Sequence, residues 1–198
     1  MHEHKHCGHK HKEGHGPGYK GICDSDRRKM MDPHVILPKI GLKPGMTLVD
    51  VGCGQGFFAL PAARIAGPEG RVYGIDIDAE ALDLLSLKAS DAGLNINALR
   101  GDAGQTVACE GCADIVFFGI SLHDFTEPEK VLDNAWRMLK PGGVLADLDG
   151  KNAGKDGGSR PGNRLSEKEA SQLIEEANFN IVSVEDFSDR FYLILAKK

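Results

Sequence analysis

Three glycines separated by single residues, Gly52, Gly54 and Gly56, are the feature of this sequence best suited to holding a ligand. They lie in VDVGCGQGFF, between an apolar run at 46–51 and a helix-like pattern at 57–66. Glycine allows a tight turn and lets a ligand approach the backbone without a Cβ in the way. Unpaired N–H groups at the start of the following helix would face that ligand. The segment therefore predicts a cofactor loop, whose candidate binding residues are Asp50, Gly52, Cys53, Gly54 and Gly56.

Two other nucleotide-binding loops do not fit the residues around these glycines. The dinucleotide fingerprint G-x-G-x-x-G/A needs a third small residue for close packing of the helix. Counting from Gly52, that position is occupied by Phe57. A Walker A phosphate loop also fails, because no Gly-Lys-Ser/Thr follows.

Acidic residues follow the next expected strand, at 71–75. A carboxylate at the end of this strand can accept hydrogen bonds from both hydroxyls of a ribose. Asp76 has that position, 20 residues after Gly56. Asp78 directly precedes an expected helix at 79–92, and Asp is a favoured N-cap residue. We therefore expect Asp76 to bind ribose and Asp78 to cap the helix.

A candidate acid–base pair follows the apolar strand expected at 113–118. His123 and Asp124 would lie at the carboxyl end of this strand, where ligands bind in open α/β sheets. The unperturbed pKa of histidine, about 6.5, suits a group that accepts a proton. His123 is thus the candidate catalytic base, with a purely structural hydrogen bond as the alternative. Asp124 could orient His123 or cap the turn before the next helix.

Strand and helix patterns alternate along the chain, which indicates a parallel sheet covered by helices on both faces. The two final strands flank a Ser-Asp turn and are expected to form an antiparallel pair. The sequence predicts an α/β fold with a single, doubly wound, mostly parallel seven-stranded sheet whose last strand is antiparallel. The expected strands are 46–51, 71–75, 96–99, 113–118, 144–148, 181–187 and 191–196, and the expected helices begin near residues 33, 57, 79, 128 and 166.

Over residues 33–198, the ordered set of motifs resembles the class I methyltransferases that depend on S-adenosylmethionine (SAM). VDVGCGQGFF looks like their first motif, and LKPGGVL at 139–145 is similar to a piece that ends a helix and starts a strand. The Asp-Pro at 32–33 and LKPGM at 42–46 resemble small-molecule methyltransferases of ubiquinone and menaquinone biosynthesis. The resemblance implies a Rossmann-like methyltransferase fold, SAM as the cofactor and a small-molecule methyl acceptor.

The resemblance also implies roles for residues outside the glycine loop. It supports Asp76 as the ribose ligand and implies that Ile77 packs on the adenine face. Asp102 would accept from the adenine amino group, while the Ala103 N–H would donate to the ring. Gly119 would lie near the methionine end of SAM.

Residues 1–20 form a compositionally separate tail that contains six of the eight histidines and Cys7. With few apolar residues the tail cannot bury a core, so we expect a disordered, histidine-rich tail before a SAM-binding domain at 21–198. Deprotonated histidines can bind a divalent metal. Cys109 and Cys112 form one C-x-x-C pair, which supplies only two of the four ligands of a closed zinc site. The alternatives are therefore a metal- or metalloid-handling protein, including a metalloid methyltransferase, or a SAM-binding protein without catalysis.

Composition limits the remaining classes. Residues 1–34 hold seven of the 24 Lys/Arg and five of the 29 Asp/Glu, a formal +2, which leaves 17 and 24, a formal −7, for the rest of the chain. An acidic body argues against a broad nucleic-acid-binding face. No apolar run has the ~18 residues of a membrane span, and no secretory signal is visible. The chain is expected to be cytoplasmic with reduced thiols, and its oligomeric state stays open.

Overall fold

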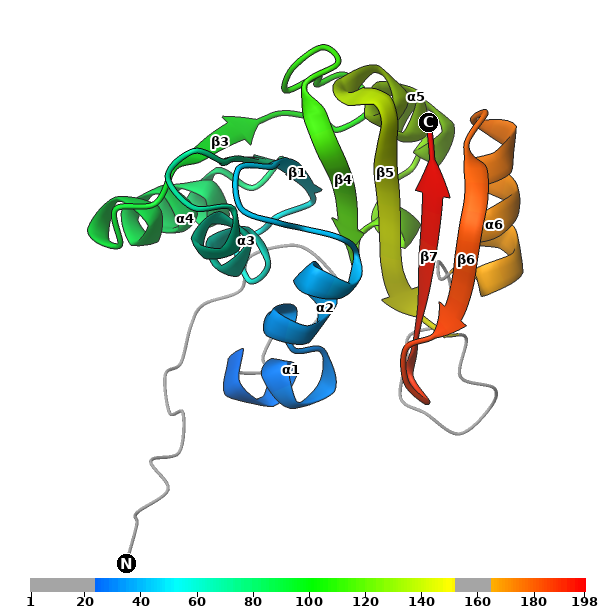
Figure 1. The fold of residues 1–198 in the computed structure, drawn as a ribbon, viewed down its shortest axis with the longest axis horizontal. Helices are drawn as coiled ribbons and strands as arrows, with labels where there is room; N and C mark the ends of the chain where they lie inside the picture. Colours follow the sequence, from blue (N-terminus) through cyan, green and yellow to red (C-terminus); the bar gives the residue numbers. More distant parts are fainter. Residues whose placement is uncertain (1–23, 152–164) are drawn as a thin grey trace, which may run out of the picture.

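The computed structural model describes residues 24–151 and 165–198, which form one sheet with helices on both faces (Figure 1). The tail at 1–20, with its histidines and Cys7, lies outside the described residues, as do residues 152–164. The strands are β1 (Thr47–Val51), β2 (Arg71–Asp76), β3 (Ile96–Arg100), β4 (Ala113–Gly119), β5 (Leu139–Gly150), β6 (Asn180–Asp186) and β7 (Phe191–Lys197). The helices are α1 (Asp24–Met30), α2 (Pro33–Lys39), α3 (Ala59–Ala66), α4 (Ala79–Asp91), α5 (Pro128–Met138) and α6 (Glu167–Glu176), with a 3-10 turn η1 (Leu122–Asp124).

The strand order is β3-β2-β1-β4-β5-β7-β6. The pairs among β1 to β5 are parallel, whereas β7 runs antiparallel to both β5 and β6. The predicted fold class is confirmed, including the antiparallel last strand. The order along the sheet reverses between β1 and β4, so the carboxyl ends of these two strands mark the crevice where open α/β sheets bind ligands.

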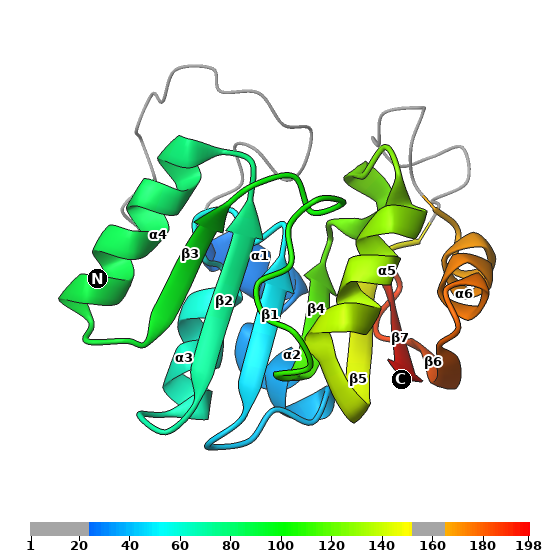
Figure 2. The same ribbon diagram turned by 90° about the horizontal axis from the view of Figure 1, so that it is seen from above.

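Two apolar cores lie on opposite faces of the sheet. One contains side chains of α2, α3 and α4, and the other contains side chains of α5 and α6. Neighbouring residues of β1 alternate between them, since Leu48 belongs to the first core and Val49 to the second. Figure 2 shows α4 at the β3 edge of the sheet and α6 at the β6 edge. Within 24–151 and 165–198, none of the helices has the length and apolarity needed to cross a membrane.

Side chains of three residues cap the N-termini of the helices α2, α4 and α6. The Asp78 carboxylate accepts from Ala81 N at 3.2 Å, which confirms its predicted role as the N-cap of α4. Asp32 caps α2 by accepting from His34 N at 2.9 Å. Ser166 and Glu169 form a capping box at the start of α6.

Two elements differ from the sequence prediction. The helix α1, DSDRRKM, was not predicted because it has no apolar face and buries none of its residues. The strand β5 begins at Leu139, five residues before the strand expected at 144–148, and so includes the Lys-Pro-Gly-Gly run. A register shift between Ala113 and Ile115 of β4 accommodates these extra residues in the pairing.

Candidate functional site

The glycine-rich loop leaves β1 at the carboxyl edge of the sheet and folds over the end of β2. The N–H groups of Gly52 and Cys53 both donate to the carbonyl of Ile75, at 2.8 and 3.1 Å. Gly52 has φ +78°, and a Cβ there would lie 2.7 Å from Ser121 Cβ, so a side chain is excluded by packing. Gly54 also has positive φ, yet a Cβ there would meet no atom of the described residues within 4 Å. Gly54 is therefore the point where a ligand can approach the backbone.

The remaining predicted residues, Cys53, Gly56 and Gly119, are packed against neighbouring side chains. A Cβ at Gly56 would lie 2.4 Å from Leu85 Cδ1 of α4, so this glycine brings the loop close to the helix. Cys53 is buried, and burial raises the pKa of its thiol, which keeps the thiol protonated. A Cβ at Gly119 would lie 2.6 Å from the Phe58 ring, so the end of β4 also packs closely beneath the loop.

Asp76 ends β2 and is hydrogen-bonded to the glycine loop. Its Oδ2 accepts from Gly54 N at 2.7 Å, and its Oδ1 accepts from Asp78 N at 2.9 Å. A carboxylate has about four lone-pair sites, so these two bonds leave acceptor capacity for a ligand. Ile77 follows with a relative exposure of 70%, so an apolar residue is exposed beside this acid.

Asp50 is a buried carboxyl group at the base of the loop, with a relative exposure of 1%. Burial raises its pKa from 3.8 to about 7, and the negative charge of Asp76 adds to the increase. Its Oδ2 has no hydrogen-bond partner among residues 24–151 and 165–198. A buried acceptor without a partner suits a ligand that brings a donor or a positive charge to this position.

The next loop, after β3, contains Asp102 and Ala103. Asp102 is exposed, and its Oδ1 accepts from Gly104 N at 2.7 Å. The carbonyl of Ala103 accepts from the Asn134 side chain of α5 at 2.9 Å, which fixes this loop to the helix. Asn134 was missed by the sequence analysis. Its signal was a polar residue on the buried face of α5.

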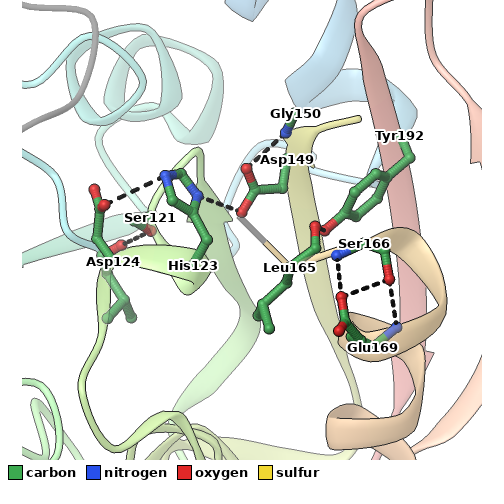
Figure 3. A network of polar contacts seen from close by, with 10 residues as sticks. Ser121, His123, Asp124, Asp149, Gly150, Leu165, Ser166, Glu169 and Tyr192 are labelled. Carbon is green, nitrogen blue, oxygen red and sulfur yellow. Dashed lines mark hydrogen bonds and ion pairs between the residues drawn. The ribbon is translucent and has the colours of Figure 1, made fainter. Parts of the chain in front are cut away.

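His123 lies in η1, directly after β4, and is held by two carboxylates (Figure 3). Its Nδ1 is 2.7 Å from Asp149 Oδ2, and its Nε2 is 3.3 Å from Asp124 Oδ1. The side chains of His123 and Asp149 are 7% and 1% exposed, whereas that of Asp124 is 36% exposed. The buried partner Asp149 is fixed further by Gly150 N, which donates to its Oδ1 at 2.6 Å. Asp149 was missed because nothing in the sequence pairs it with a residue 26 positions away.

Asp147 lies two residues before Asp149 on the same face of β5 and is completely buried. Burial and the neighbouring Asp149 raise its pKa well above the ordinary range. Neither of its carboxylate oxygens is hydrogen-bonded within the described part of the chain. A protonated Asp147 adds no second negative charge beside Asp149. Tyr192 of β7 lies opposite Asp149 in the sheet, and its hydroxyl donates to Leu165 O at 3.4 Å (Figure 3).

A side-chain hydrogen bond joins the segment that contains His123 to the start of the glycine loop. Ser121, two residues before His123, donates from Oγ to Val51 O at 2.6 Å, at the point where β1 enters the loop. Ser121 is also the residue that closes the space beside Gly52. The carboxyl ends of β1 and β4 therefore hold the glycine loop and the His–Asp pair as one unit.

Cys109 and Cys112 form a disulfide, which corrects the expectation that the thiols are reduced. The pairing follows from a tight turn in which Gly111 N and Cys112 N donate to carbonyls at the end of α5, and the two Cα atoms are 5.8 Å apart. The pair precedes β4 and so lies at the amino edge of the sheet, opposite the glycine loop. Across the described ranges, no three His, Cys, Asp or Glu side chains are grouped to hold a metal ion.

This chain is similar to known methyltransferases. A family model described as a methyltransferase domain matches residues 49–146. A demethylmenaquinone methyltransferase of Geobacillus kaustophilus (strain HTA426) is 30% identical over 126 residues, 63% of this chain and 54% of that protein. A nocamycin O-methyltransferase of Saccharothrix syringae is 34% identical over 128 residues, 63% of this chain and 46% of that protein. This chain thus spans about half the length of the curated relatives that it matches.

A solved structure extends the match to almost the whole described fold. The SAM-dependent methyltransferase from Aquifex aeolicus superimposes with a TM-score of 0.81 at 29% identity, covering 89% of this chain and 98% of that one. The sheet order, the glycine loop and the acids at the ends of β1 and β2 match a Rossmann-like methyltransferase fold. The matched domain, the curated relatives and this solved structure support a class I SAM-dependent methyltransferase, with SAM as the cofactor.

Proposed function

We propose that this chain transfers a methyl group from SAM to a small organic acceptor whose nucleophilic atom carries a proton. The observation that supports this most directly is the His123–Asp149 pair, 2.7 Å apart, at the carboxyl end of β4 and linked through Ser121 to the glycine loop. SAM supplies an activated methyl group on a sulfonium, so the protein has to align the acceptor and remove its proton.

Residues at the carboxyl edge of the sheet each bind a different part of the cofactor. Asp76 accepts hydrogen bonds from the ribose hydroxyls, and Ile77 covers one face of the adenine. Asp102 and the Ala103 N–H bind the adenine edge. Asp50 faces the ammonium group at the amino-acid end of the cofactor, where Gly54 leaves room for a ligand. The unpartnered Oδ2 of Asp50 and the open approach at Gly54 support this assignment.

His123 acts as the general base through Nε2. Asp149 accepts from Nδ1–H and so fixes the tautomer whose lone pair is on Nε2. Asp124 now lies 3.3 Å from Nε2 and has to give way when the acceptor binds. The greater exposure of Asp124 supports its mobility relative to the buried Asp149.

A small acceptor is supported by the curated relatives, which are named a demethylmenaquinone methyltransferase and a nocamycin O-methyltransferase. A thiol-bound metalloid acceptor is not supported, because Cys109 and Cys112 lie at the opposite edge of the sheet and form a disulfide.

The experiment that tests the proposal combines binding with turnover. S-adenosylhomocysteine (SAH) is titrated calorimetrically into wild type, Asp76→Ala and Asp83→Asn, the last being an exposed acid of α4 used as a control. Loss of a charge-assisted acceptor in Asp76→Ala should weaken SAH binding by ~10- to 150-fold. SAH formation from SAM is then followed with a panel of phenols, hydroquinones and carboxylic acids. Folded wild type that does not bind SAH would overturn the proposal.

A further inference from the structure

The connection from β3 to β4 contains no helix, although all of its residues, 101–112, are described. Each of the other connections among β1 to β5 contains one, namely α3, α4 or α5. Figure 2 shows the connection passing over the face of the sheet that carries α5, and its Ala103 belongs to the same apolar core as that helix. Without a helix of its own, the connection needs other partners for its buried backbone groups.

The helix α5 supplies several of these partners. Asn134 Nδ2 donates to Ala103 O at 2.9 Å, near the start of the connection. Met138 lies four residues further along the helix, on the same face, and its sulfur accepts from Ala108 N at 3.3 Å. The carbonyl of Met138 accepts from Cys112 N at 3.0 Å, at the end of the connection. One side of α5 therefore fixes the connection at both ends.

The bond from Asn134 reaches the expected adenine ligand through a single peptide group. Asn134 holds the oxygen of the peptide between Ala103 and Gly104, and the N–H of the same peptide donates to Asp102 Oδ1 at 2.7 Å. A peptide group is planar, so fixing its oxygen also fixes the direction of its N–H. The orientation of the Asp102 carboxylate thus depends on Asn134. One bond to Gly104 leaves acceptor capacity on this carboxylate for a ligand.

Asn134 is held from its other side by a cation. Arg137 Nη1 donates to Asn134 Oδ1 at 3.4 Å, and Arg137 Nη2 donates to Glu110 Oε1. The side chain of Arg137 is 55% exposed, whereas Asn134 has a relative exposure of only 6%. A charged donor polarises the amide and strengthens the next hydrogen bond in the chain. A series of bonds therefore runs from a surface guanidinium through a buried amide to Asp102.

We propose that Asn134 is a positioning residue for the nucleobase: by holding the peptide after Ala103, it sets the Asp102 carboxylate to accept from an exocyclic amino group and to disfavour a carbonyl. This inference rests on the proposed function, which places adenine at Asp102. In the alternative, Asn134 only stabilises the fold. A substitution would then affect all cofactor analogues equally, whatever group the base carries.

The test compares two ligands that differ at the base. They are SAH and S-inosyl-L-homocysteine, in which a ring carbonyl replaces the exocyclic amino group of adenine. Both are titrated calorimetrically into the full-length wild type, Asn134→Asp, Asn134→Ser, Arg137→Met and Asp133→Ser. Asn134→Asp keeps the size of the side chain and removes its donor. Asp133→Ser is the matched control, because it changes the exposed neighbour of Asn134 on the same helix.

Wild type and Asp133→Ser should bind SAH about 10- to 150-fold more tightly than the inosine analogue. Both Asn134 variants should lower this ratio about tenfold through weaker SAH binding, with the analogue bound within about threefold of wild type. Arg137→Met should lower the ratio about two- to fivefold. An unchanged ratio in the Asn134 variants, or an equal loss for both ligands, overturns the positioning role. If these variants do not fold, Arg137→Met decides, and an unchanged ratio there overturns it.

Failure of this inference and failure of the proposed function give different results. If wild type binds SAH and the inosine analogue equally, Asp102 does not read the amino group and the role of Asn134 fails. The titration of Asp76→Ala then still tests the ribose site on its own. If wild type binds neither ligand, the proposed function itself fails.

Discussion

Asp149 Oδ2 lies 2.7 Å from His123 Nδ1, and both side chains are almost completely buried at the carboxyl edge of the sheet. The two carboxylates next to His123, those of Asp149 and Asp124, therefore have different roles. Asp149 is held by Gly150 N and cannot easily leave, whereas Asp124 contacts the other ring nitrogen from a more exposed position. The buried contact orients the ring, and the exposed contact covers the nitrogen that would accept a proton.

Substitutions around His123 should therefore have unequal effects on the rate. His123→Gln is expected to lower kcat by ~10²- to 10⁴-fold because it removes the general base. Asp149→Asn should lower kcat by ~10²-fold because the ring loses the acceptor that fixes its tautomer. Asp124→Asn should change kcat by less than about threefold, since its contact is lost when the acceptor binds. The measurement is turnover at saturating SAM, with SAH affinity as the control. A larger loss in Asp124→Asn than in Asp149→Asn would reverse the assigned roles.

Asp50 should make the cofactor-free protein less stable as the pH rises. Its pKa is raised from 3.8 to about 7 in the folded state, so the folded state binds the extra proton between these values. The contribution to folding is fully present below pH 3.8 and is lost as the pH rises through about 7. At about 1.4 kcal/mol for each pH unit, the loss is about 4 kcal/mol at most.

Asp50→Asn removes this titration and should be more stable than wild type at pH 8 but not at pH 4. Urea unfolding of the cofactor-free protein at both pH values measures the difference in the free energy of unfolding. Asp83→Asn, at an exposed position of α4, should show no such pH dependence. If the Asp50→Asn and wild-type stabilities run parallel from pH 4 to 8, the raised pKa of Asp50 is wrong.

Gly52 and Gly54 should respond differently to the same substitution. Gly52→Ala places a Cβ 2.7 Å from Ser121 Cβ and should cost about 2–5 kcal/mol of stability through strain and overpacking. Gly54→Ala meets no described atom within 4 Å and should cost only the ~1–2 kcal/mol of a left-handed residue. Its methyl group should nevertheless lower SAH affinity about tenfold or more, because it occupies the ligand approach.

Thermal unfolding and SAH titration of the two glycine variants separate these effects. A Gly54→Ala protein that binds SAH like wild type would show that the cofactor does not approach this part of the loop.

The Cys109–Cys112 disulfide should affect stability and leave cofactor binding unchanged. In the chain-entropy model, closing so short a loop stabilises the fold by about 2 kcal/mol. The Cys109→Ser/Cys112→Ser variant should therefore unfold at lower urea concentration, with SAH affinity within about threefold of wild type. The wild type treated with a dithiol reductant provides the matched comparison. A strong loss of SAH binding on reduction would show that the amino edge of the sheet communicates with the glycine loop.

Local signals in the sequence predicted the fold and the position of the glycine loop between β1 and α3. The caps at Asp78 and Ser166 and the glycine spacing act over a few residues, so each can be read directly from the chain. The contacts of Asp149 with His123 and of Asn134 with Ala103 join residues 26 and 31 positions apart. Only the folded register of β4, β5 and α5 brings them together. The helix α1 was not predicted because its residues are mostly charged and show no apolar stripe.

The hydrogen bond from Gly54 N to Asp76 Oδ2 joins segments 22 residues apart before any ligand arrives. The loop and the acid already hold one relative geometry, so the entropy of ordering them is lost during folding and not during association. Preorganisation of this kind favours a single kinetic phase of cofactor binding, with a rate proportional to ligand concentration and no slow isomerisation afterwards. The cofactor site should therefore change little in structure when SAM binds. The larger movement should occur at Asp124, when the methyl acceptor binds.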